Sequence, residues 1–293
     1  MNRIHLFSLT VFLLCVLLRS EAKRVLLLPH LQPSHVNEHR VVGSELVRRG
    51  HEVYIVLAET SHKIKFDGTG ITVLWFESSA DDILFDSEEL SVWMSESAFA
   101  GSFSIERVKE ATALHCQLLM NDDRLLNSLK TLDFDYAIVD TFFMDMCLLV
   151  VPEYLGIPFS SLSLSLSLSK MGIPELPSFG PLRFFALPQK VNLLQRLQMF
   201  CMTCIMNTAE GFFLNRNETF LKIYAPRSVS WDELLKKSEL FIIPVSFSAL
   251  YPFLSLPNVI RTNGIAFRDA KTLTKDWGNV ILGRDPFASA RHI

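Results

Sequence analysis

The stretch Ser34-His-Val-Asn-Glu-His-Arg-Val-Val-Gly-Ser-Glu-Leu-Val-Arg-Arg-Gly-His-Glu-Val-Tyr-Ile-Val-Leu57 predicts a helix, a glycine stop and a strand. Ser34 is a candidate N-cap residue, and the apolar residues that follow recur at four-residue spacing on one helical face. Gly50 follows the last helical residue, where glycine commonly ends a helix. His35 is therefore expected in the first helical turn.

An apolar run, Arg24–Leu28, comes before this stretch and predicts a buried strand. The resulting β–α–β unit is typical of a doubly wound sheet. Runs rich in branched and aromatic residues predict further strands at Ile71–Phe76, Phe134–Val139, from Ile157, Glu239–Ile243 and Asn258–Gly264. Helical spacing occurs between them, at Ile105–Leu129 and Met144–Tyr154. The chain is expected to be an α/β domain with a mainly parallel sheet and helices on both faces.

Two segments each allow two interpretations. Ser160–Ser169 alternates serine with leucine, which suits either a strand with one apolar face or a loop that lines a pocket. Val191–Phe213 is rich in Leu, Met and Phe and has few charges. This composition predicts either a helix packed in the core or a helix that lies in the surface of a membrane.

Residues 1–22 have the features of a secretory signal peptide. Arg3 gives a positive start, Leu6–Leu18 is an apolar core, and Ser20–Ala22 fits a cleavage site. An uncleaved anchor is the alternative, although the apolar run is short for a membrane span. The chain is expected in the endoplasmic reticulum lumen or elsewhere in the secretory pathway, with no C-terminal transmembrane anchor.

The mature chain carries a glycosylation signal and no signal for nucleic-acid binding. Asn217 begins the sequon Asn217-Glu-Thr219, so it is a candidate glycosylation site in the secretory compartment. The net charge of −3 comes without a basic patch, which argues against a nucleic-acid partner.

The four cysteines after the signal peptide have irregular spacings that do not predict a disulfide framework: Cys116, Cys147, Cys201 and Cys204. The last two have the spacing of a redox or zinc pair. However, they lie in an apolar, helical run without a second pair, which favours packing in the core.

His35 and Asp140 form the candidate catalytic pair. Each follows a predicted strand, so both are expected at the carboxyl edge of the sheet, where open α/β folds bind ligands. A carboxylate that accepts one ring N–H fixes the histidine tautomer and leaves the other nitrogen free to act as a general base. The positive helix N-terminus is expected to oppose the carboxylate and keep the imidazole neutral. The alternative is a capping or solvated histidine and a turn-forming aspartate.

Other chemistries find less support. No Ser or Cys accompanies the pair in a nucleophile elbow, and the first strand is not followed by Gly-x-Gly-x-x-Gly or a phosphate loop. His35 and His39 lie four positions apart with Glu38 between them, but the order differs from His-Glu-x-x-His, so no metal is expected. His30 is a rival base without a helix to orient it.

These residues resemble the UDP-glucuronosyltransferases and, more broadly, the UDP-glycosyltransferases (glycosyltransferase family 1). The opening block is Ser34-His35, Glu45-Leu46 and Arg49–Val53. Later blocks match at Cys116, Asn121, Leu125, Phe134-Asp135, Val139-Asp140, Gly156–Phe159, Glu239–Phe241, Pro257–Val259 and Gly264. The resemblance begins near Arg24 and ends near Trp277.

The resemblance implies a GT-B enzyme, whose Rossmann-like N-terminal half holds a small lipophilic acceptor and whose C-terminal half holds a UDP-sugar. It assigns His35 as the base that removes the acceptor hydroxyl proton, and Asp140 as the residue that orients this base. The reaction it implies is an inverting, metal-independent transfer of a hexosyl or glucuronosyl group. The UDP-sugar is then a donor substrate, and no cofactor is required.

The resemblance covers only the N-terminal half of the family. The Pro-Gln, His-Gly-Gly and Asp-Gln elements of the donor half are absent, and residues 278–293 form an atypical tail. We therefore expect residues 23–277 to be the acceptor-binding domain of a truncated enzyme that is inactive alone. The alternatives are a non-catalytic lipophile-binding or regulatory partner of full-length family members, and an unstable product with exposed apolar surface. A peripheral membrane contact is a further expectation.

Overall fold

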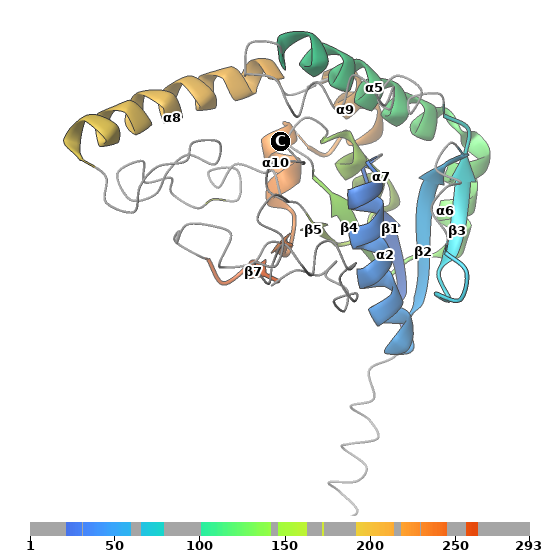
Figure 1. Cartoon of the computed structure of the whole chain (residues 1–293). Coiled ribbons are helices and arrows are strands. Elements are labelled where there is room, and N and C mark those ends of the chain that lie inside the picture. Colours follow the sequence, from blue (N-terminus) through green and yellow to red (C-terminus); the bar gives the residue numbers. More distant parts are fainter. Residues whose placement is uncertain are drawn as a thin grey trace, which may run out of the picture.

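The computed structural model describes residues 22–30, 32–59, 66–78, 101–141, 146–162, 172, 192–213, 218–228, 230–244 and 256–262. Within these residues, parallel strands form a sheet in the order β3-β2-β1-β4-β5-β6-β7 (Figure 1). The strands are β1 (Arg24–Leu28), β2 (Glu52–Ala58), β3 (Thr72–Phe76), β4 (Tyr136–Asp140), β5 (Phe159–Leu162), β6 (Phe241–Ile243) and β7 (Val259–Arg261). The predicted α/β fold with a mainly parallel sheet is confirmed.

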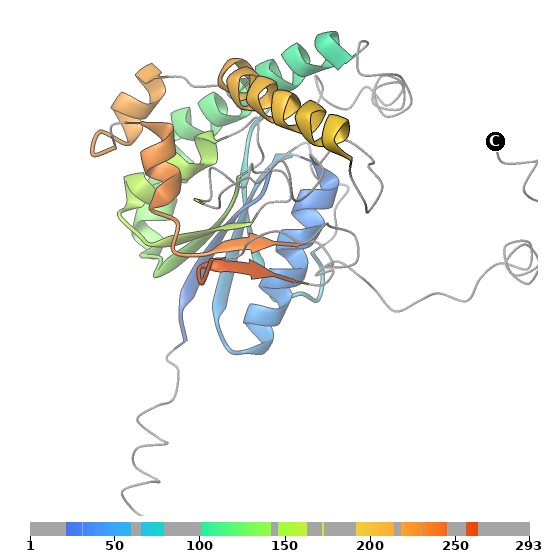
Figure 2. The ribbon, with the colours of Figure 1, turned by 90° about the vertical axis from the view of Figure 1, so that its left-hand side faces the viewer.

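Strand side chains alternate between two hydrophobic layers, because successive residues of a strand point to opposite faces of the sheet. Val25 and Leu27 of β1 belong to the layer under helix α2 (Pro33–Arg48), and Leu26 and Leu28 belong to the opposite layer. The opposite layer is covered by α5 (Gly101–Asn121), α6 (Asp123–Leu132), η2 (Cys147–Leu149), α7 (Val150–Leu155), α9 (Glu218–Tyr224) and α10 (Trp231–Lys236). Figure 2 shows α2 on one side of the sheet and the green helices on the other. Helices therefore cover both faces, as predicted.

Helix α2 begins two residues earlier than its sequence suggests. The N-cap residue is Gln32, whose side chain makes no capping hydrogen bond, so the predicted cap at Ser34 is wrong. Pro33 occupies the first turn, where its fixed φ suits a helix and its missing N–H costs no hydrogen bond. His35 lies in the first turn, as predicted.

Two glycines determine where α2 ends and how closely it packs. Gly50 has a φ of 91°, and the N–H of His51 donates to the carbonyl oxygen of Leu46 at 3.1 Å, which terminates the helix as predicted. Gly43 faces the sheet, and a Cβ atom there would approach the Cδ1 atom of Leu27 to 2.7 Å. The missing side chain thus lets α2 lie close against β1.

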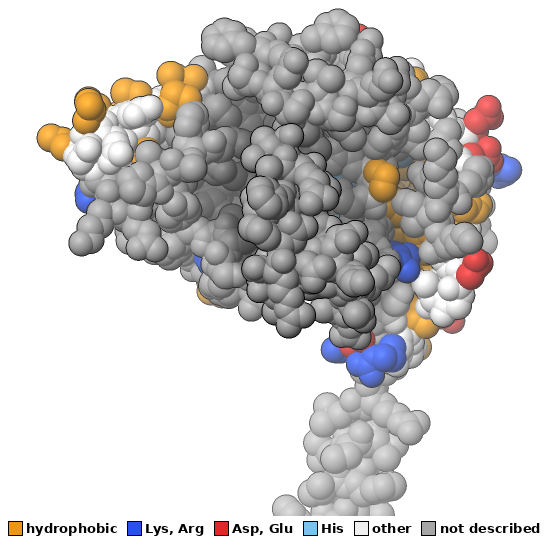
Figure 3. Space-filling view, viewed as in Figure 1, with side chains coloured by type: hydrophobic (Ala, Val, Ile, Leu, Met, Phe, Trp, Pro, Cys, Tyr) orange, Lys and Arg blue, Asp and Glu red, His pale blue; other side chains and the backbone are white. Residues whose placement is uncertain are grey.

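Helix α8 (Leu193–Phe213) carries apolar side chains on its exposed surface, on the side of the molecule toward which the strands point (Figures 1 and 3). Five residues that are 55–83% exposed, which we call the outer face of α8, are Leu193, Leu194, Leu197, Phe200 and Ile205. Cys201 and Cys204 are also exposed. The core packing predicted for the two cysteines is therefore wrong. Of the two interpretations of the helix, packing in the core does not hold for its outer face, although Met199 is buried. None of the described helices is long and apolar enough to cross a membrane.

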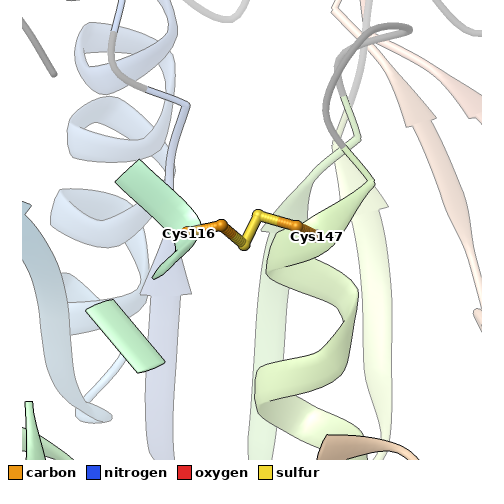
Figure 4. The surroundings of a disulfide bond; sticks show 2 residues. All are labelled: Cys116 and Cys147. Atoms are coloured by element: carbon orange, nitrogen blue, oxygen red, sulfur yellow. A yellow bond between two sulfur atoms is a disulfide. The ribbon is translucent and has the colours of Figure 1, made fainter. Parts of the chain in front are cut away.

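Cys116 of α5 and Cys147 of η2 form a disulfide bond between two elements of the same layer (Figure 4). Their Cα atoms lie 6.1 Å apart, a separation that disulfides commonly span. The irregular cysteine spacings did not reveal this pair, because its proximity comes from the packing of α5 against η2 and not from a local motif.

We expect reduction of this bond to lower the free energy of unfolding by about 3 kcal/mol. The bond closes a loop between residues 31 positions apart, and it therefore restricts the unfolded chain. Urea unfolding of the mature chain with and without dithiothreitol measures the difference. In the double variant Cys116→Ser/Cys147→Ser the reductant should have no effect, and equal midpoints for the wild-type chain under both conditions would contradict the prediction.

Candidate active site

Strand pairing brings His35 and Asp140 together across 105 positions of sequence. Strands β1 and β4 are parallel neighbours, and Leu28 at the end of β1 lies opposite Val139 near the end of β4. Asp140 is the last residue of β4, and α2 begins shortly after β1. Asp140 shares the strand alternation of Ile138, whose side chain packs in the layer under α2. Its carboxylate is therefore on the same face as His35.

The two side chains form a short hydrogen bond in a site that is largely closed to solvent. The Nδ1–H of His35 donates to the Oδ2 atom of Asp140 at 2.6 Å. His35 is 8% exposed and Asp140 is 2% exposed. With the proton on Nδ1, the Nε2 atom of the neutral ring carries a lone pair that can accept a proton. The predicted contact between His35 and Asp140 is thus present.

Burial and charge act in opposite directions on the pair. Burial alone lowers the pKa of His35, but the charge and hydrogen bond of Asp140 outweigh burial and raise this pKa above its ordinary value. Burial likewise favours a neutral Asp140, but His35 lowers the pKa of this carboxyl. The net effect is a pKa of His35 above that of free histidine, because the influence of Asp140 exceeds that of burial. The predicted effect of the helix N-terminus on this ring stays a prediction.

Two further histidines lie beside the pair, and the sequence had given them other roles. The rival base His30 is 1% exposed, and its ring centroid lies 5.5 Å from that of His35. Burial lowers the pKa of His30 to about 4, so its ring stays neutral near pH 7. His39, which was considered with His35 as a possible metal ligand from the sequence, is fully buried. Its Nδ1–H donates to the backbone oxygen of His35 at 3.0 Å. In the part of the chain that the structure describes, no group of three His, Cys, Asp or Glu side chains could hold a metal ion.

His115 is a buried histidine that interacts electrostatically with His30 and that the sequence did not single out. It lies on α5, packs its ring against Phe76 with the centroids 5.0 Å apart, and is 4% exposed. Burial and, to a lesser extent, the charge that His30 would carry together lower its pKa to about 3. Its position four residues after Ala111 in a helical run is consistent with burial, but no local signal connects it with the residues around His30.

Several other predictions lie outside the described residues: Asn217, the signal peptide, most of Ser160–Ser169 and the tail at 278–293. The described beginning of the serine–leucine run is strand β5, in which Ser160, Ser161 and Leu162 are buried. The strand interpretation is therefore correct for this first part.

A family model described as "UDP-glucoronosyl and UDP-glucosyl transferase" matches residues 23–282, which is most of the chain. The chain belongs to this family. Among curated relatives of this UDP-glycosyltransferase-family chain, mouse UDP-glucuronosyltransferase 1A9 is 25% identical over 281 residues, which cover 92% of the chain and 53% of the relative. Human 2-hydroxyacylsphingosine 1-beta-galactosyltransferase is 26% identical over 271 residues, which cover 88% of the chain and 48% of the relative. The chain thus spans about half the length of these relatives.

Solved glycosyltransferases are more distant in sequence. Spinosyn forosaminyltransferase SpnP is 15% identical, with a TM-score of 0.44, and the match covers 87% of this chain and 54% of that one. The calicheamicin glycosyltransferase CalG4 is 14% identical, with a TM-score of 0.37, over 78% of this chain and 48% of that one.

We expect the buried histidines to make the fold acid-sensitive. His30 and His115 have pKa values of about 4 and about 3 in the folded chain, below the 6.5 of the unfolded chain. Their contribution to stability is therefore complete above pH 6.5 and falls as the pH decreases, by up to about 1.4 kcal/mol per pH unit for each ring. His39 acts in the same sense, and the depressed pKa of Asp140 affects stability only at lower pH. The raised pKa of His35 causes no loss in this range, because its contribution is complete below pH 6.5.

Urea unfolding between pH 7 and pH 4.5 measures this slope. In the variant His115→Leu the decrease in stability per pH unit should be smaller, by up to about 1.4 kcal/mol, because this variant has one buried ring fewer to protonate. A slope unchanged in this variant would show that His115 does not resist protonation in the folded chain.

Proposed function

We propose that this chain is the acceptor-binding, base-carrying part of a UDP-glycosyltransferase, with His35 as the general base and Asp140 as its orienting carboxylate. The observation that carries the proposal is the 2.6 Å hydrogen bond between these side chains at the carboxyl edge of the sheet. Membership of the family supports the reaction class, since its model names UDP-sugar transferases over residues 23–282.

In the proposed reaction the Nε2 atom of His35 takes the proton of an acceptor hydroxyl, whose oxygen attacks the anomeric carbon of a UDP-sugar. The bond from that carbon to the UDP oxygen breaks, and UDP leaves with the electron pair. A single displacement of this kind inverts the anomeric configuration. The charge of Asp140 stabilises the imidazolium that forms, and burial strengthens this interaction because little water screens it.

We propose a small lipophilic acceptor and a hexosyl or glucuronosyl donor. The printed names of the relatives describe glucuronosyl and galactosyl transfer by those proteins. We assign no described residue to the UDP-sugar, and the chain spans about half the length of these relatives. The proposal therefore limits this chain to the acceptor side of the reaction and expects transfer only when a donor-binding half is present.

The base can be tested in a chimeric enzyme that joins residues 23–277 to the donor half of mouse UDP-glucuronosyltransferase 1A9. The variant His35→Ala should lower kcat/KM by at least about 10²-fold, because it removes the side chain that takes the proton from the substrate hydroxyl. His51→Ala, outside the site, is the control and should leave the rate unchanged. Near-normal turnover by the His35 variant would contradict the assignment.

The alternative is a non-catalytic module that binds lipophiles or regulates full-length family members. Calorimetric titration of the mature chain with UDP and UDP-sugars, beside a transfer assay, tests the restriction to the acceptor side, and the activity of the chimera separates the two functions. A chimera that is inactive with every acceptor, combined with co-precipitation of the chain with a full-length relative, would favour the regulatory role.

A lumenal location in the secretory pathway fits this function. The disulfide between Cys116 and Cys147 is of the kind that persists in oxidising compartments. Glycosylation of Asn217 belongs to the same proposal, and a mass shift on treatment with a peptide N-glycosidase would detect it.

We also propose that the outer face of α8 contacts a lipid surface. Its leucine, phenylalanine and isoleucine side chains are exposed together, and Arg196 is the sole charged residue between Leu193 and Ile205. Such a face is typical of a helix that lies in the membrane interface.

We expect the mature chain to sediment with vesicles of phosphatidylcholine and phosphatidylserine. The double variant Leu194→Gln/Leu197→Gln should bind at least about tenfold more weakly, because each leucine contributes about 1.5–3 kcal/mol when buried. Ile223→Gln, which changes an exposed apolar residue of α9, is the matched control. Equal binding by the double variant, or dimerisation of the wild-type chain in place of vesicle binding, would contradict the lipid contact.

A further inference from the structure

His30 contacts the residue from which helix α2 starts. The ring is 1% exposed, and its Nδ1 atom accepts a hydrogen bond from the backbone N–H of Gln32 at 3.3 Å. Gln32 is the N-cap residue, and its carbonyl oxygen accepts the N–H groups of His35 and Val36 at 3.0 and 3.1 Å. One hydrogen bond therefore separates His30 from the helical turn that contains His35.

This contact matters because the N-cap side chain itself does not support the helix start. The side chain of Gln32 makes no capping hydrogen bond, and Pro33, which follows it, has no N–H to donate. Side-chain caps normally hold the entry of the chain into a helix. At α2 the imidazole of His30 holds the backbone of the N-cap residue from outside the helix.

The same ring also lies against His35 itself. The two ring centroids are 5.5 Å apart, with the planes inclined at 60°. Asp140 acts electrostatically on both rings. His30 thus contacts both parts that determine where His35 points, namely the start of its helix and its imidazole.

We propose that His30 is a positioning residue for His35: it holds the N-cap residue through Nδ1 and the imidazole of His35 through its ring, so that His35 stays directed at Asp140. The inference rests on the proposed function, since it serves the same base. It replaces the interpretation of His30 as a rival base, because its Nδ1 lone pair is engaged with Gln32.

The two contacts can be removed one at a time. His30→Phe keeps a ring against His35 but has no acceptor for the Gln32 N–H. His30→Asn keeps an acceptor oxygen the same number of bonds from Cβ as Nδ1, but it has no ring. Histidine-selective nitrogen labelling of the mature chain gives the pKa and the Nδ1 proton signal of His35 by NMR, and amide exchange reports on Gln32.

In His30→Phe we expect the Gln32 amide to exchange about fivefold faster, the effect of one lost hydrogen bond. The Nδ1 proton signal of His35 should broaden, and its raised pKa should fall toward 6.5 as the contact with Asp140 loosens. In His30→Asn the Gln32 amide should keep its protection, with a smaller change at His35. If His30→Phe does not fold, the proposal is tested with His30→Asn alone, by the change in the Nδ1 proton signal and pKa of His35.

His35 signals that match the wild-type chain in the folded variants, even with a lower Tm, would overturn the proposal and leave His30 a packing residue. Asp140→Asn is the reference, because it removes the carboxylate that His35 contacts. If His35 has the same Nδ1 proton signal and pKa in the wild-type chain as in Asp140→Asn, then His35 is not held by Asp140 and the proposed base is refuted. That result differs from a failure of the His30 role, in which only the His30 variants match the wild-type chain.

Discussion

Parallel pairing of β1 with β4 is the constraint on which the candidate site depends. The register places the ends of the two strands side by side, with Leu28 opposite Val139. The helix that carries His35 starts just beyond β1, and Asp140 ends β4 on the face that α2 covers. A shift of one residue in β4 would turn the carboxylate to the opposite layer, because strand side chains alternate. The pair therefore exists only while this register holds.

Burying the polar side chains around His35 and Asp140 costs free energy. His30 and His39 are buried as neutral rings close to the pair, and Asp140 is buried as a carboxylate that His35 stabilises by its hydrogen bond and charge. Such a group of polar side chains would be unfavourable in a core that needed only stability. Concentration of shifted pKa values around one short hydrogen bond is instead characteristic of sites that transfer protons.

The two layers of the fold are held by different means. On the α2 side, Gly43 allows close packing of the helix on β1 and so fixes how far the helix axis lies from the sheet. On the opposite side, the disulfide between Cys116 and Cys147 links α5 to η2. The site lies on the close-packed side, where small displacements of α2 translate directly into displacements of His35. Helix α8 differs from both, since the five apolar residues of its outer face are exposed.

Local patterns in the sequence determined the strands, the end of α2 at Gly50, and His35 and Asp140 as a pair at one edge of the sheet, because hydrophobic periodicity and strand ends are readable within short segments. Tertiary structure alone decided the rest. The outward face of α8, the bond between Cys116 and Cys147, and the packing of His115 against Phe76 depend on contacts between distant segments. Periodicity distinguishes one side of a helix from the other, but what each side meets follows only from how the elements pack.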